Sequence, residues 1–216
     1  MTAAGRHLIR SDSPAGLTPA GWAALLGHGI RTIVDLRNDD ERQSPAAPAA
    51  PGAAGLAVVH VPLDDLADSA FWRRVWDEGL DGTPLYYRPF LERKPERCAA
   101  AVAAVADAGP GGVLVHCTVG RDCAGLVTLL LVLGAHRVGP GPAGSLARRG
   151  TAAREVILAT LEAVDVGAVL RAGGLSDRRR PTVRHRLLEP PAPGPAAGRP
   201  RPTATRPGRR SGPSGR

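Results

Sequence analysis

The chain of 216 residues has few aromatic side chains: three Trp, two Tyr and two Phe. Proteins that bind single-stranded nucleic acid by stacking offer several aromatic rings to the bases. The scarcity of rings therefore argues against a stacking platform of that kind. Cysteine is also scarce, and three residues, an odd number, cannot form a disulfide framework. A reducing cytoplasm is the location that this cysteine content favours.

Long hydrophobic runs are missing as well. The longest nearly continuous apolar run covers residues 124–135, which is 12 residues. A membrane-spanning helix needs about 20. Residues 1–10 lack the apolar segment that a secretory signal requires. These absences predict a cytoplasmic protein with no membrane span.

Acidic residues become rare toward the end of the chain. Residues 1–136 carry 12 basic and 15 acidic side chains, whereas residues 137–216 carry 16 Arg and five acidic residues. Residues 190–216 hold eight Pro, five Gly, six Arg and no acid. Such a composition buries too little apolar surface to offset the entropy of ordering, so it predicts a disordered Pro/Arg-rich tail. A basic tail predicts weak, salt-dependent contact with polyanions, nucleic acid or acidic partners.

Strand and helix patterns alternate through the rest of the chain, which predicts an α/β sheet flanked by helices. A domain over 1–189 is expected, with an irregular, shortened stretch at 137–150 and no helical pattern after Asp177. Cys98 and the cluster of Trp72, Trp76, Tyr86 and Tyr87 are interpreted as core, and His28 and His60 as structural. The predicted strands are 31–36, 57–61 and 113–115, and the predicted helices begin at Pro19 and cover 71–78, 84–93, 95–108, 124–135 and 151–162.

A cysteine stands where the third predicted strand gives way to a helix. His116 and Cys117 end the apolar stretch 113–115, and a short turn then opens the helix at Ala124. Backbone N–H groups in such a turn and the helix N-terminus attract anions and stabilise a thiolate. A thiolate in this position can attack phosphorus, and Asp122 in the same turn can protonate the leaving oxygen.

The segment from His116 to Gly125 resembles the phosphate-binding loop of cysteine-dependent protein tyrosine phosphatases, His-Cys-(X)5-Arg-(Ser/Thr)-Gly. It is most similar to the bacterial tyrosine/serine phosphatase family, whose loop has the sequence His-Cys-X-X-Gly-(Lys/Arg)-Asp-Arg-Thr-Gly. The resemblance covers most of residues 8–135 and part of 151–188. It extends to four further segments, 10–12, 34–37, 86–91 and 151–165.

The resemblance implies a role for each loop residue. Cys117 is implied as the nucleophile, His116 as a support for its thiolate, and Asp122 as the acid. Arg121 matches a phosphate-contacting Lys or Arg, and no metal or organic cofactor is implied. Asp35 and Arg37 either line the site or form a salt bridge at the strand end. The implied phosphate-binding residues are Thr118, Val119, Gly120, Arg121, Asp122 and Cys123.

Two positions of the loop depart from the family pattern. Cys123 stands where the family has Arg, and Ala124 where it has Ser or Thr. Arg binds two phosphate oxygens with a fork of donors that Cys does not have. Loss of one such donor lowers the rate by a factor on the order of 10²–10³. A lost arginine is the favoured interpretation, and a protective Cys117–Cys123 disulfide is the alternative.

Two functions are therefore carried forward. The first is a phosphatase for phosphomonoesters, chiefly phosphotyrosine, with phosphoserine or phosphoinositide as further substrates. The second is a catalytically inactive relative that binds phosphorylated partners. A sulfurtransferase of the rhodanese kind also uses a loop cysteine. That activity does not explain the arrangement of His116, Cys117 and Asp122 or the match at Asp35 and Arg37.

Overall fold

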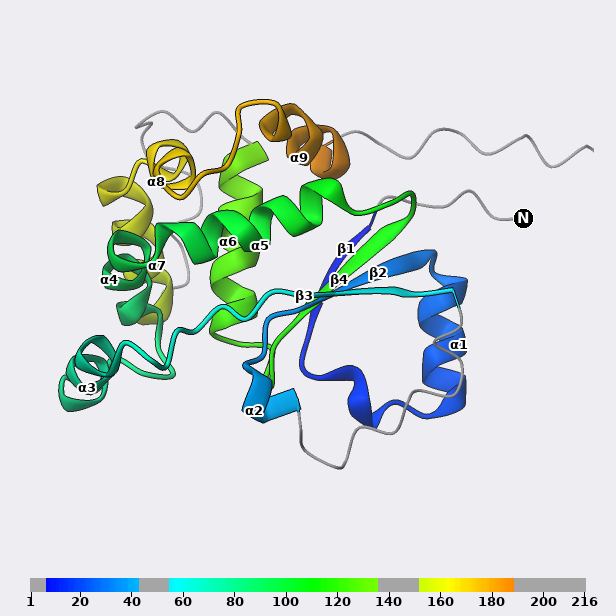
Figure 1. Cartoon of the computed structure of the whole chain (residues 1–216), viewed down its shortest axis with the longest axis horizontal. Helices are drawn as coiled ribbons and strands as arrows, with labels where there is room; N and C mark the ends of the chain where they lie inside the picture. The colour runs from blue at the N-terminus through cyan, green and yellow to red at the C-terminus, as the bar shows by residue number, and fades with distance from the viewer. Residues whose placement is uncertain (1–6, 43–54, 136–151, 189–216) are drawn as a thin grey trace, which may run out of the picture.

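The computed structural model describes residues 7–42, 55–135 and 152–188. Its strands form one parallel sheet in the order β1-β4-β2-β3, so β4 and β2 are central. Because all four strands run in the same direction, their carboxyl ends meet at one edge of the sheet (Figure 1). The strands are β1 (Leu8–Ser11), β2 (Ile30–Asp35), β3 (Ala57–His60) and β4 (Gly112–His116).

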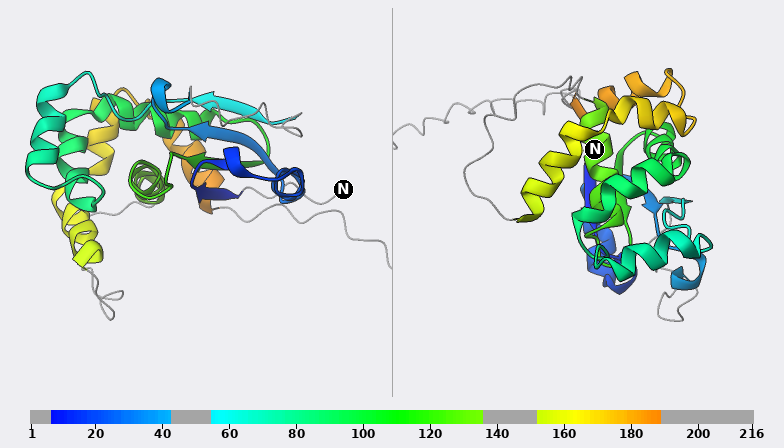
Figure 2. Two further views of the ribbon diagram at one scale, coloured as in Figure 1. Left: turned by 90° about the horizontal axis from the view of Figure 1, so that it is seen from below. Right: turned by 90° about the vertical axis from the view of Figure 1, so that its left-hand side faces the viewer.

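Helices cover both faces of this sheet, which confirms the predicted α/β class. The structure contains α1 (Pro19–Gly27), α2 (Asp39–Arg42), α3 (Ser69–Asp77), α4 (Tyr87–Arg93), α5 (Pro95–Asp107), α6 (Cys123–Ala135), α7 (Ala152–Ala163), α8 (Val166–Ala172) and α9 (Arg179–Leu188), with short 3-10 turns at Pro14–Gly16 and Pro84–Tyr86. Helices α3, α4 and α7 gather at one end of the molecule, and α1 lies at the other (Figures 1 and 2). None of the described helices combines the length and the apolar character needed to cross a membrane.

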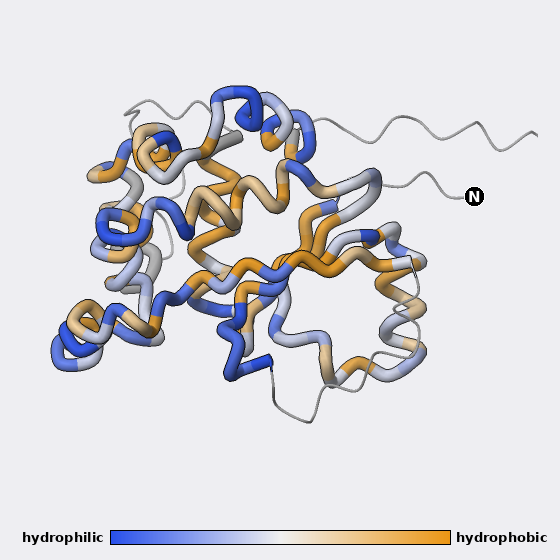
Figure 3. The backbone as a smooth tube through the Cα atoms, in the orientation of Figure 1, coloured by the Kyte–Doolittle hydropathy of each residue, from blue (hydrophilic) through white to orange (hydrophobic). Residues whose placement is uncertain are grey.

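The sheet has a core on each side. Trp22 of α1 packs with Ile30, Ile33 and Leu114 in a small cluster. Side chains of β2 and β4 outside that cluster, such as Val115, join a larger core that includes α5 and α6. Every residue of β4 is buried, as expected for an interior parallel strand. Figure 3 shows the strands and α6 as apolar segments and α2 as a hydrophilic one.

Local sequence explains where several elements begin and end. Thr18 accepts a hydrogen bond from the Gly21 N–H at 3.2 Å, and Pro19 occupies the first turn of α1, as predicted. Gly29 has φ +82°, a conformation that suits glycine, and it turns the chain into β2. The predicted helix 84–93 is divided into a 3-10 turn and α4.

The expectation that no helix follows Asp177 is wrong, because α9 covers Arg179–Leu188. Val183 is only 2% exposed and packs in the larger core. Arg179 pairs with Asp107 of α5 at 2.8 Å, and Arg186 donates to the Gly111 carbonyl. A strongly basic helix with few apolar residues hides its periodicity, so the sequence pattern alone did not show it.

Two earlier expectations concern residues beyond the described ones, and one strand was not expected. The irregular stretch 137–150 and the tail 190–216 lie outside the described residues. Strand β1 is described but was not predicted as a strand. It has only four residues, and its edge position leaves polar residues such as Arg10 exposed. Its pairing with β4 is what identifies it.

Candidate functional site

The turn that joins β4 to α6 surrounds the sulfur of Cys117. The Gly120 N–H donates to Cys117 Sγ at 3.2 Å, and the thiol of Cys123 also hydrogen-bonds to this sulfur. The bond from Cys123 is the largest influence on the pKa of Cys117, and backbone N–H groups of Val119, Gly120 and Ala124 lower it further against burial. The pKa falls to about 6, so Cys117 is mainly a thiolate at neutral pH.

Gly120 is a requirement of this turn. Its φ of +71° is unfavourable for other residues. A Cβ at this position would lie 2.4 Å from Asp12 N, which leaves no room for one. The Ser13 N–H also donates to the Thr118 carbonyl at 3.2 Å. The segment that follows β1 therefore holds the loop in shape, which gives the family-like segment 10–12 a structural role.

His116 lies immediately before Cys117 and is 2% exposed. Its Nδ1 is 3.2 Å from the Cys117 carbonyl oxygen, and its Nε2 is 3.6 Å from Asp35 Oδ1. Burial lowers the pKa of His116, and the Asp35 carboxylate opposes this effect. A buried imidazole fixed at both ring nitrogens orients the strand end that carries Cys117. Its support of the thiolate remains a prediction.

Asp35 and Arg37 form the salt bridge that was one of the two alternatives. Arg37 Nη2 lies 2.8 Å from Asp35 Oδ2, and Arg42 Nε lies 3.3 Å from the same oxygen. Burial raises the pKa of Asp35, but the hydrogen bonds from Arg37 outweigh it and hold the pKa below its ordinary value. This carboxylate is thus committed to two guanidinium groups. Contact of either residue with substrate remains a prediction.

The more exposed side chains of the loop differ in what they contact. Thr118 donates a short hydrogen bond to Glu41 of α2. Val119 is 65% exposed beside the loop amides. Arg121 Nε lies 3.2 Å from Asp122 Oδ1, and the Arg121 side chain is 66% exposed. The residues assigned to phosphate contact and to proton donation are therefore paired with each other.

Cys123 lies between Cys117 and a carboxyl group. Its thiol hydrogen-bonds to Cys117, and its Sγ lies 3.2 Å from Asp64 Oδ2. The bond to Cys117 and burial raise the pKa of Cys123 far above its ordinary value, so this residue remains a thiol. All three cysteines are free, so the disulfide alternative is not the arrangement in this structure.

Asp64 is a site residue that the sequence analysis missed. It follows β3, and the adjacent Leu63 N–H donates to the Leu36 carbonyl at 3.1 Å. Burial raises the pKa of Asp64 to about 6. Its Oδ1 is buried without a hydrogen-bond partner in the described part of the chain. The sequence carried one signal for this residue. Two adjacent acidic residues, Asp64 and Asp65, follow Pro62 at the edge of the sheet where ligands of parallel sheets bind. Asp65 differs, because it pairs with Lys94 at 2.9 Å.

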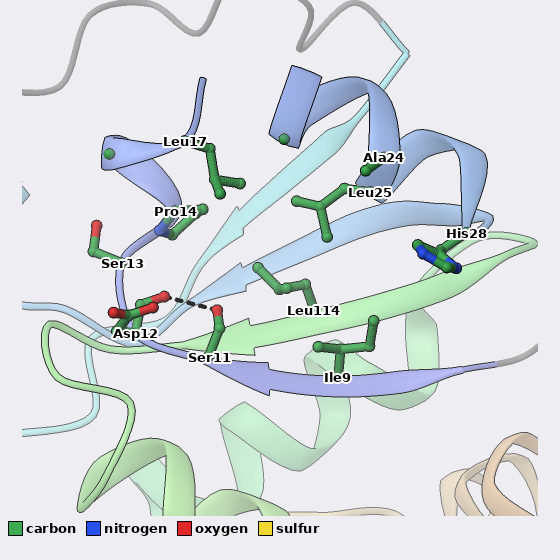
Figure 4. Close-up of a pocket in the computed structure, with 12 residues that line it drawn as sticks. Ile9, Ser11, Asp12, Ser13, Pro14, Leu17, Ala24, Leu25, His28 and Leu114 are labelled. Carbon is green, nitrogen blue, oxygen red and sulfur yellow. Dashed lines mark hydrogen bonds between the residues drawn. The ribbon is translucent and has the colours of Figure 1, made fainter. Parts of the chain in front are cut away.

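Helix α4 also contacts the loop. Tyr87 of α4 donates to the Asp122 carbonyl at 3.2 Å, which ties the segment 86–91 to the loop. Within the residues that the structure describes, no group of three His, Cys, Asp or Glu side chains is placed to hold a metal ion. A cavity of about 530 Å³ lies on the α1 side of the sheet, between Leu25 and Leu114 (Figure 4).

A parallel α/β sheet with a buried cysteine inside a ring of backbone amides defines the class of proteins that bind anions at a strand-to-helix turn. The profile of the tyrosine phosphatase family matches residues 3–138, more than half of the 216 residues. The chain belongs to the tyrosine phosphatase family. No curated protein matches the chain.

Proposed function

We propose that this chain hydrolyses phosphomonoesters through a phosphocysteine at Cys117. The observation that carries the proposal is the lowered pKa of Cys117, about 6, inside a ring of N–H donors. Cys117 Sγ forms a bond to phosphorus while the bond from phosphorus to the ester oxygen breaks. Water then attacks phosphorus, and the thiolate leaves as inorganic phosphate forms.

The substrate class follows from the family and from the loop surface. Phosphotyrosine in a protein is the principal substrate we propose, with phosphoserine or phosphoinositide as secondary ones. The exposed Val119 offers an apolar contact beside the site, which suits an aromatic ring. A cytoplasmic location fits a mechanism that needs a free thiol, because reducing conditions keep cysteine unpaired.

The lack of a free positive charge at the site supports a weakened phosphatase activity. Backbone amides stabilise one side of a bound phosphate, but Cys123 supplies no cation on the other. Arg121 is occupied by Asp122, so it must leave this partner before it can bind phosphate. A reduction on the order of 10²–10³ relative to an arginine-containing loop is expected.

A second function is supported by the same observation. The same absence of a cation at Cys123 favours a chain that binds phosphorylated partners through the loop amides without turning them over. Such binding needs the N–H groups and not the nucleophile. It is therefore expected to survive Cys117→Ser, whereas hydrolysis is not.

The deciding experiment measures phosphate release from p-nitrophenyl phosphate and from a phosphotyrosine peptide. The protein as it stands is compared with Cys117→Ser and Cys123→Arg. Turnover that is lost in Cys117→Ser supports the proposal, and Cys123→Arg is expected to raise kcat/KM by about 10²-fold. Silence in the parent with activity in Cys123→Arg supports the binding function instead. Silence in both, with phosphopeptide binding that Cys117→Ser retains, also favours the second function.

A further inference from the structure

Helix α1 and the sheet enclose a cavity that takes no part in the chemistry proposed above. Its volume is about 530 Å³, and it lies between α1 and strands β1 and β4 (Figure 4). Trp22 packs α1 onto Ile30 and Ile33 of β2, which leaves the part of the sheet beside β2 less covered. Folded proteins are closely packed, and a space of this size is typical of a site for a small molecule.

The walls of the cavity are apolar. Leu17 and Leu25 face the space from the helical side, and Ile9 and Leu114 face it from the sheet (Figure 4). Leu17 is 39% exposed and Gly16 beside it is exposed as well, so the space is open to solvent and a ligand can enter it. In a pocket of this kind, burial of apolar surface supplies most of the affinity.

One end of the cavity carries a carboxylate. Asp12 stands at this end, and His28 lies at the opposite end (Figure 4). The Ser11 hydroxyl donates to the backbone carbonyl of Asp12, and within the described residues the Asp12 carboxylate itself has no ion pair or hydrogen bond. No Lys or Arg is among the described residues that line the cavity. An unpaired carboxylate beside apolar walls is complementary to a cation on an apolar molecule.

The residues at the carboxylate end also hold the phosphate-binding loop. They form segment 11–14, all four residues of which line the cavity. The backbone of Asp12 leaves no room for a Cβ at Gly120 of the loop, and the Ser13 N–H donates to the Thr118 carbonyl at 3.2 Å. A ligand that binds only when segment 11–14 is in this position favours the matching arrangement of the loop.

We propose that this cavity binds a small amine with an apolar body, and that the bound amine stabilises the phosphate-binding loop through segment 11–14. The ammonium group pairs with the Asp12 carboxylate, and the apolar body lies between Leu25 and Leu114. Binding of the amine is independent of the proposed phosphatase function, whereas its effect at the loop rests on that function. The amine therefore tightens phosphate binding, and by linkage phosphate tightens amine binding by the same factor.

The test uses tryptamine, which joins an apolar indole ring to an amine that is charged at neutral pH. Tryptophol, with a hydroxyl in place of the ammonium group, is the matched neutral probe. Isothermal titration calorimetry of the full chain should give a Kd below about 1 mM for tryptamine. The Kd for tryptophol should be at least about tenfold higher, because its hydroxyl makes no charge-assisted bond. Saturating tryptamine should lower the Kd for inorganic phosphate about fivefold.

Two pairs of variants locate the binding site. Asp12→Asn keeps the size of the side chain but removes its charge, so it should weaken tryptamine binding at least about tenfold and leave tryptophol binding unchanged. Asp39→Asn, at an exposed carboxylate of α2, should match the parent. Ala24→Trp fills the cavity from α1 and should abolish binding of both probes. Ala23→Trp adds the same side chain at an exposed position of α1 that does not line the cavity, and binding should persist.

The outcomes separate the amine site from the proposed function. A parent that does not bind tryptamine overturns the inference, as does equal tryptamine binding in the parent and Asp12→Asn. Binding that Ala24→Trp retains places the amine elsewhere and overturns it too. Tryptamine binding that leaves the Kd for phosphate unchanged overturns the link to the loop. A parent that binds tryptamine through Asp12 but neither binds phosphate nor hydrolyses p-nitrophenyl phosphate supports the amine site and contradicts the proposed function, and the effect at the loop with it.

Discussion

Asp35 and Asp64 stand at the same edge of the sheet, yet their surroundings are opposite. Asp35 contacts Arg37, Arg42 and His116, and its pKa lies below the ordinary value. Asp64 contacts a thiol, has one unpartnered oxygen, and has a pKa of about 6. The comparison teaches that neighbouring cations, more than depth in the fold, decide which carboxylate builds the site and which can exchange a proton.

The largest expected effect comes from removing the carboxylate of Asp35, which is paired with two Arg side chains. Asp35→Ala leaves Arg37 and Arg42 without their shared partner, and we expect the free energy of unfolding to drop by about 3 kcal/mol, the lower end for breaking a buried pair. Urea denaturation measures this change. Asp39→Ala, at a carboxylate whose side chain is 78% exposed, is the matched control and should leave stability unchanged. Equal losses in both variants would contradict the assignment of Asp35 as a structural centre.

A smaller effect is expected in the pH dependence of stability that comes from Asp64, the carboxyl group without a cation beside it. Because the folded-state pKa of Asp64 is raised to about 6, its contribution to stability is complete below the unfolded value near 4 and is lost as pH rises through 6. The parent should therefore lose about 1.4 kcal/mol relative to Asp64→Asn between pH 5 and pH 8. Urea unfolding of both proteins at the two pH values checks this. A constant difference would contradict the raised pKa.

The smallest expected change concerns the thiol of Cys123, which lies between Cys117 and Asp64. Cys123→Ala removes the leading influence that lowers the pKa of Cys117, so this pKa should rise from about 6 by roughly one unit or less. The rate of iodoacetamide alkylation against pH reports the thiolate. Cys98→Ala, a change at a fully buried thiol of α5, should leave the profile in place. An unshifted profile in Cys123→Ala would mean that the backbone amides alone stabilise the thiolate.

The elements with strong local patterns could be predicted from the sequence. The apolar stretch before His116 identified β4, and the turn that follows identified Cys117 as the centre of the site. Gly120 was placed in the phosphate-binding turn, but its contact with Asp12 is a packing constraint between distant segments. A local pattern does not contain such contacts.

The features that were missed depend on tertiary contacts. Strand β1 is stable because it pairs with β4, and α9 because Val183 enters the core. The pKa of Asp64 depends on burial beside Cys123, 59 residues further along the chain. Adjacent Asp64 and Asp65 look equivalent in the sequence. Only the fold gives Lys94 to one and a buried thiol to the other.

The segment after β1 contacts the loop, and this contact has a consequence for the whole chain. Ser13 and Thr118 lie about 105 residues apart, so their contact forms only after most of the chain has been brought together. The groups that lower the pKa of Cys117 stand within this loop, between Val119 and Ala124. The reactivity of the thiol therefore depends on a short stretch of chain whose shape is held by a partner more than a hundred residues away.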